Sequence, residues 1–142
     1  MNIEKASFIT AVGAFITALI GSWDAAIITL IIFMAADWIT GLTVAGVFKK
    51  SPKSETGALE SRVGLKGLCR KGAMLLIVII AYRLDLMAGL NGVLRTGAII
   101  TLVCNEALSV LENVSLMGVK YPAIVDRAIR QLLGDKSDKD EK

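Results

Sequence analysis

The sequence predicts an all-α, multi-pass membrane protein, and two observations carry that prediction. Of the 142 residues, 54% are hydrophobic and only 20% are charged, which is too few polar residues to cover a soluble domain of this size. The apolar residues are also clustered. Residues 6–23 carry no charge, residues 25–48 carry only Asp37, and residues 96–118 carry only Glu106 and Glu112. Because a membrane span needs roughly 20 mostly apolar residues, each segment is a candidate span.

The first expected helix covers about residues 6–22. We expect it to be retained, because the residues before it are less basic than those of a typical cleaved signal peptide. Small residues gather on one of its faces, which would let another helix approach closely within lipid, although such residues are also frequent in membrane helices generally. This predicted packing face comprises Thr10, Ala14, Thr17, Ala18 and Gly21.

The second expected helix covers about residues 25–48, and Asp24 is well placed to cap its N-terminus. Its single charge, Asp37, lies near the middle. This carboxylate could pair with a basic residue such as Arg70 or Arg83, face an aqueous lumen, or reach an interface. Gly41 follows closely and gives room for a helix–helix contact.

A basic loop, residues 49–71, follows with seven basic and two acidic residues. The positive-inside rule therefore predicts that this loop is cytoplasmic. Basic residues near its end recur at helical spacing, which is typical of an interfacial helix on anionic headgroups, although a solvated loop fits equally well. The predicted membrane-surface residues are Arg62, Lys66, Arg70 and Lys71.

The third expected helix, about residues 65–88, contains a short apolar run between charged residues. It can span only if Arg70 and Lys71 reach toward the interface, or if Arg83 and Asp85 lie inside the span. A turn at 89–92 precedes the fourth expected helix, about residues 95–119. Residues 122–133 form an amphipathic helix that is too short and too charged to span, so we expect it on the membrane surface.

These elements predict one helical domain over residues 1–134, with about four transmembrane helices and a charged, disordered tail at 135–142. Four spans would place both termini in the cytoplasm. In the alternative with three spans, the first or third helix is only partly inserted.

Polar residues on the fourth helix are the strongest functional signal. Six of them share an arc of roughly 140° at 100° per residue. An ionised acid in mid-bilayer needs a partner, a cation or water, so an oligomer could turn this stripe toward a shared lumen. The other interpretation is a stripe paired within the chain, with Arg83 or Arg95 as counter-charge. The polar stripe comprises Thr101, Asn105, Glu106, Ser109, Glu112 and Asn113.

Other kinds of site are not indicated. The chain has no histidine and its two cysteines are isolated, so we expect no metal site and no cofactor. No nucleophile with a base and no phosphate loop is apparent, so we expect no enzyme activity. The basic residues flank apolar segments, which is the membrane pattern rather than that of a nucleic-acid-binding protein.

Three sequence elements resemble those of the toxin-secretion/phage-lysis holin family. The segment from Asp37 to Gly41 resembles its Asp-x-x-Thr-Gly element. Ser61, Gly64, Gly67, Arg70 and Lys71 resemble its Ser-x-x-Gly-x-x-Gly-x-x-Arg/Lys-Lys element. Asn105-Glu106, Ser109 and Glu112-Asn113 match its Asn-Glu-x-x-Ser-x-x-Glu-Asn element. The resemblance covers roughly residues 25–133.

The resemblance implies a pore-former that self-associates in the lipid bilayer of the bacterial cytoplasmic membrane. Such proteins open to release an endolysin or to aid export of a large toxin, and they are not enzymes. The residues alone leave a second hypothesis open, a small ion channel or transporter that uses Asp37 or Glu106. The long basic loop and the amphipathic helix favour the first.

Overall fold

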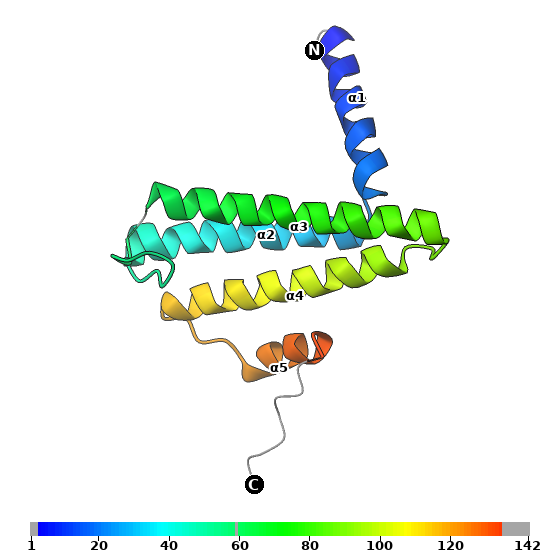
Figure 1. Cartoon of the computed structure of the whole chain (residues 1–142). Coiled ribbons are helices and arrows are strands. Elements are labelled where there is room, and N and C mark those ends of the chain that lie inside the picture. The colour runs from blue at the N-terminus through cyan, green and yellow to red at the C-terminus, as the bar shows by residue number, and fades with distance from the viewer. Residues whose placement is uncertain (1–2, 59, 135–142) are drawn as a thin grey trace.

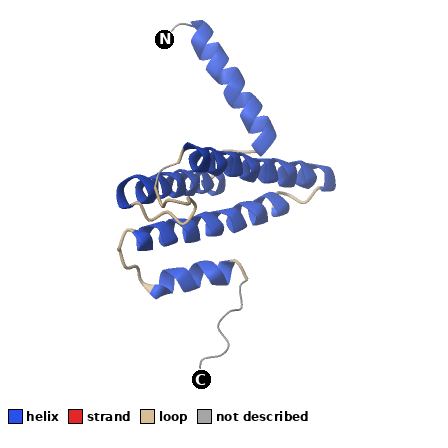
Figure 2. Ribbon diagram, turned by 60° about the vertical axis from the view of Figure 1, so that its left-hand side comes forward, coloured by secondary structure: helices blue, strands red, loops and turns tan. Residues whose placement is uncertain are grey.

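The computed structural model describes residues 3–58 and 60–134, and within them every regular element is helical (Figure 2). The predicted tail, residues 135–142, lies outside the described residues. The prediction of an all-α protein is confirmed. The elements are α1 (Ile3–Ile20), α2 (Ala25–Thr43), the π-helical turn η1 (Val44–Phe48) that extends α2, α3 (Ser61–Ala88), α4 (Val93–Leu116) and α5 (Ala123–Leu132).

Three helical segments in the described residues are long and apolar enough to cross a membrane: α1, α2 together with η1, and α4. Helix α3 is the longest, with 28 residues, but it is not among these candidates because it carries six charged residues. It begins at Ser61, earlier than predicted. Four of the seven basic residues predicted in the loop, Arg62, Lys66, Arg70 and Lys71, therefore lie on the first turns of α3.

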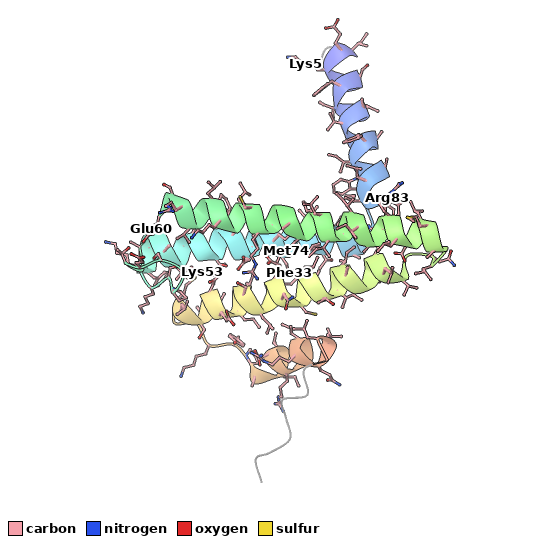
Figure 3. The ribbon with its side chains drawn as sticks, in the orientation of Figure 1. Lys5, Phe33, Lys53, Glu60, Met74 and Arg83 are labelled. Carbon is pink, nitrogen blue, oxygen red and sulfur yellow. The ribbon has the colours of Figure 1, made fainter. Side chains whose placement is uncertain are left out.

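Helices α2, α3 and α4 run side by side as a three-helix bundle, as both views show (Figures 1 and 2). Helix α1 leaves one end of this bundle steeply and touches it through α3. The loop between α2 and α3 lies at the opposite end, where Lys53 and Glu60 are seen in Figure 3. Helix α5 lies against α4.

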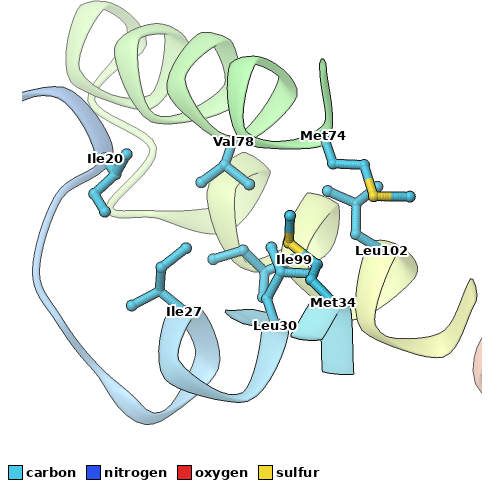
Figure 4. Packing of buried hydrophobic residues seen from close by; sticks show 8 residues of the cluster. All are labelled: Ile20, Ile27, Leu30, Met34, Met74, Val78, Ile99 and Leu102. Atoms are coloured by element: carbon cyan, nitrogen blue, oxygen red, sulfur yellow. The ribbon is translucent and has the colours of Figure 1, made fainter. Parts of the chain in front are cut away.

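The bundle core repeats a spacing of three and four residues on each helix, which keeps one face turned toward the two neighbours. On α3 the buried positions are Lys71, Met74, Val78, Ala81 and Asp85. The part of the core drawn in Figure 4 is apolar, and buried charged residues lie on either side of it: Asp85 and Arg95 toward α1, and Asp37, Lys71 and Glu106 toward the loop. The apolar part comprises Ile20, Ile27, Leu30, Met34, Met74, Val78, Ile99 and Leu102.

The helix ends follow from local chemistry. The Oδ1 atom of Asp24 accepts a hydrogen bond from the backbone N–H of Ile27 at 3.0 Å, so the predicted N-cap of α2 is confirmed. Pro122 occupies the N-cap of α5, so this helix begins at Ala123, one residue later than predicted. The turn at 89–92 contains three residues with positive φ, which reverses the chain tightly between α3 and α4.

Gly21 ends α1 in the left-handed region, with φ of +84°. A Cβ atom there would lie 3.0 Å from a ring carbon of Tyr82 and 3.2 Å from Nε of Arg95. We expect Gly21→Ala to lower the free energy of unfolding in detergent by about 1–2 kcal/mol, because an alanine must adopt the strained left-handed conformation. Circular dichroism during thermal unfolding measures this.

Gly13→Ala is the matched control, because a Cβ at Gly13 meets nothing within 4 Å and the residue is helical. It should leave stability unchanged or raise it slightly. Equal melting temperatures of the Gly21→Ala and Gly13→Ala variants would contradict a tight junction at Gly21.

Candidate functional site

Five polar residues from α2, α3 and α4 form a buried ion-pair cluster: Asp37, Thr40, Lys71, Glu106 and Asn113. Nζ of Lys71 donates a hydrogen bond to Oδ2 of Asp37 at 2.8 Å and another to the carboxylate of Glu106. The Glu106 side chain is only 3% exposed and the Lys71 side chain 9%. One ammonium group thus joins carboxylates from two different helices.

Asn113 completes the cluster from the α4 side. Its Nδ2 atom donates to Oγ1 of Thr40 at 2.9 Å and lies 3.3 Å from both Oδ1 and the backbone oxygen of Asp37. The Thr40 hydroxyl in turn donates to the backbone oxygen of Ala36 at 2.8 Å. Because buried polar groups are costly when unpaired, this network ties α4 to α2 in one register.

The cluster lies near the middle of the candidate spans α2–η1 and α4, and in the third turn of α3. Removing a charge from water there costs at least about 2.5–3.5 kcal/mol on insertion scales. Pairing within the chain offsets part of this cost. Two carboxyl groups nevertheless share a single ammonium group, so the cluster holds one more acid than base.

The three sequence elements identified by resemblance meet at this cluster. Gly41 lies against Asn113, since a Cβ on Gly41 would be 3.7 Å from its Nδ2 atom. Gly64 and Gly67 of α3 line a small cavity of about 70 Å³ beside it. The cavity extends from the cluster to the loop end of the bundle. Its polar lining comprises Asp37, Ser51, Lys53, Glu60, Lys71 and Asn113.

The structure corrects the expected role of Lys71, which the sequence analysis placed at the membrane surface. Lys71 is buried because it continues the core spacing of α3. It is also the partner of Asp37, for which the sequence suggested Arg70 or Arg83, and of Glu106, for which it suggested Arg83 or Arg95. Arg70 and Arg83 are both exposed.

The polar stripe of α4 is divided between two environments. Glu106 and Asn113 are buried in the cluster, as expected if these residues of the stripe pair within the chain. Ser109 is half-buried, whereas Thr101, Asn105 and Glu112 are exposed. A lumen-facing role stays a prediction for the exposed residues, and in this bundle Glu106 and Asn113 are turned away from the exposed face.

The other predicted surfaces have separate places. Arg62, Lys66 and Arg70 are exposed on α3 near the loop end of the bundle. On α1, Thr10, Ala14 and Ala18 are exposed and Thr17 is half-buried. The Thr17 hydroxyl accepts a hydrogen bond from the Trp23 indole at 3.0 Å. Only the Gly21 end of the predicted packing face is buried in the chain.

Sequence reasoning missed a second charged site at the other end of the bundle, which we call the Arg95 clamp. Arg95 donates to Oδ2 of Asp24 at 2.6 Å and to the backbone oxygens of Ile20 and Ser22 at 2.7 and 2.8 Å. The Asp85 carboxylate accepts from the backbone N–H groups of Leu94 and Arg95 at 2.9 and 2.7 Å. The end of α1 and the starts of α2 and α4 thus meet at Arg95, with Asp85 of α3 capping α4.

One titratable group of this clamp, Asp24, lies between the first two candidate spans. The hydrogen bond from Arg95 holds the pKa of Asp24 below its ordinary value of 3.8, against the opposing effect of burial. Asp24 therefore stays ionised down to acidic pH while the clamp is intact.

Comparison with known proteins yields one family and several relatives. The bacteriophage holin family matches residues 14–134. A probable holin of Bacillus phage phi105 is 34% identical over 113 residues, covering 80% of this chain and 78% of the phage protein. An uncharacterised protein of Listeria innocua is 34% identical over 130 residues, covering 92% and 87%. An uncharacterised 14.9 kDa protein of Clostridium perfringens is 34% identical, covering 90% and 92%. No solved structure matches.

Proposed function

The chain belongs to the bacteriophage holin family, and from this premise we propose that it is a homo-oligomeric pore-former of the bacterial cytoplasmic membrane. The pore would release an endolysin or aid toxin export, without catalysis by the chain itself. Its three apolar helical segments support residence in a membrane.

One observation carries the pore proposal beyond family membership: exposed polar side chains on a helix that is itself a candidate span. Thr101, Asn105 and Glu112 remain exposed on α4 after the bundle has buried Glu106 and Asn113. Lipid is a poor environment for an asparagine or an ionised glutamate. Several copies arranged in a ring could turn these side chains toward water in a shared lumen.

The same proposal gives a topology. Helix α3 lies along α2 and α4, so it would cross the bilayer with them, with its charged core residues paired inside the bundle. The basic residues at the loop end would then contact anionic headgroups on the cytoplasmic side. If α1 crosses as well, both termini would lie in the cytoplasm, but α1 would first have to turn toward the bundle axis, because it leaves the bundle end steeply in this structure (Figure 1).

The experiment that tests the function is marker release from liposomes containing the full chain. Trapped markers should range from small ions to protein-sized dextrans. A holin that passes proteins should release all of them. Release of ions alone would favour the small-channel alternative, and retention of every marker by inserted oligomers would contradict a pore.

We expect the double variant Asn105→Leu/Glu112→Leu to slow marker release at least several-fold, because two polar groups are lost from the proposed lumen. Insertion and oligomer size, measured by flotation and cross-linking, should not change. Thr29→Leu on α2 is the control, since it makes a similar polar-to-apolar change outside α4. Equal release by the double variant and wild type would remove this face of α4 from the mechanism.

A further inference from the structure

The charge balance of the buried ion-pair cluster is the starting point. Asp37 and Glu106 both contact Nζ of Lys71, and their side chains are only 12% and 3% exposed. If both carboxyl groups were ionised, the cluster would hold an uncompensated negative charge in the middle of the bundle. In such surroundings an acid takes up a proton more readily than it remains charged. One protonated carboxyl makes the cluster neutral.

The groups facing these two acids come from every element around them. Helix α3 supplies the Lys71 ammonium, and α4 supplies the Asn113 amide and the Ser109 hydroxyl, both of which face Asp37. At the loop end of the adjoining cavity lie Lys53 and Glu60, of opposite sign. Lys71 therefore provides the positive charge bonded to the acids, and it balances one of them.

A route for a proton is also present. The cavity of about 70 Å³ is large enough for a few water molecules and has the polar partners that such waters need. Asp37 and Lys71 line it, whereas Glu106 lies behind Lys71 and outside the cavity lining. A proton could pass between Glu106 and Asp37 by way of Lys71, and between Asp37 and the loop end through water.

We propose that the closed bundle binds one exchangeable proton in the buried ion-pair cluster, held by Asp37 and Glu106 on either side of Lys71. The proton reaches solvent at the loop end through the adjoining cavity. When it leaves, two carboxylates compete for one ammonium group and the contact of α4 with α2 and α3 weakens. This last step rests on the proposed pore function, whereas the binding of the proton does not.

The first test is infrared spectroscopy of the full chain in liposomes near neutral pH, where exposed carboxyl groups are ionised. Wild type should show the C=O band of one protonated carboxyl. Glu106→Gln and Asp37→Asn should each abolish it, because one carboxylate then matches Lys71. Lys71→Gln should increase the band roughly twofold, since both acids must then be neutral. Glu55→Gln, in the loop, should leave it unchanged.

A wild-type spectrum without this band would overturn the proposal, as would a band that survives in both acid variants. Marker release then tests the consequence: release by wild type should accelerate by about tenfold or more as pH rises from about 6 to about 9, and release by Glu106→Gln should not. A protonated-carboxyl band that disappears as pH rises, without any marker release, would support the proton site and contradict the pore. Release without pH dependence would overturn the coupling of proton and opening.

Discussion

Replacing Lys71 with methionine is expected to lower the free energy of unfolding by about 3–5 kcal/mol, the range observed when one partner of a buried ion pair is removed. Methionine keeps a similar length and volume but leaves Asp37 and Glu106 without the ammonium group that both contact. Denaturation of the purified protein in mixed detergent, followed by circular dichroism, measures the loss.

The adjacent residue offers the matched control. Arg70→Met removes a charge one position away, on the exposed side of α3, and should change stability by less than about 1 kcal/mol. A triple variant with Lys71→Met, Asp37→Asn and Glu106→Gln should recover much of the loss, because no charge is then left unpaired. Equal stability of the Lys71 and Arg70 variants would show that the cluster does not hold the bundle together.

Much of the fold could be predicted from the sequence, because long apolar segments and turn residues mark helices directly. The helices, the cap at Asp24 and the turn at 89–92 all follow from such local signals. The resemblance also named most of the residues that meet in the buried ion-pair cluster. Their meeting could not be derived, because it depends on how three helices are rotated about their axes.

That rotation is hard to predict in a membrane protein, since the faces toward lipid and toward the core are both apolar. Lys71 shows the difficulty: it adjoins Arg70, and charge alone does not say which of the two side chains enters the core. A signal was nonetheless available. Met74, Val78 and Ala81 follow a three-and-four spacing that extends to Lys71 at one end and Asp85 at the other.

The same spacing on α4 leads through Ile99 to Arg95, the residue whose loss should have the second large effect. We expect Arg95→Met to lower the free energy of unfolding by at least about 2 kcal/mol, because hydrogen bonds to charged groups contribute about 1.5–3 kcal/mol each and do not add fully. Two backbone oxygens, of Ile20 and Ser22, lose their charged donor. Faster hydrogen exchange of amides near the α1–α2 junction should accompany the loss.

Acidic pH should reduce the difference in the free energy of unfolding between wild type and Arg95→Met. The Arg95 hydrogen bond lowers the pKa of Asp24 in the folded protein. The stabilisation from the Arg95–Asp24 pair is therefore fully present above pH 3.8, and it disappears as pH falls through the pKa that Asp24 has in the folded state. Thermal unfolding at neutral pH and near pH 3 should therefore show the two proteins converging. Arg83→Met, which changes an exposed arginine of α3, should match wild type at both pH values. A constant difference for Arg95→Met would mean that the clamp acts through the backbone oxygens alone, because their bonds to Arg95 do not depend on Asp24 ionisation.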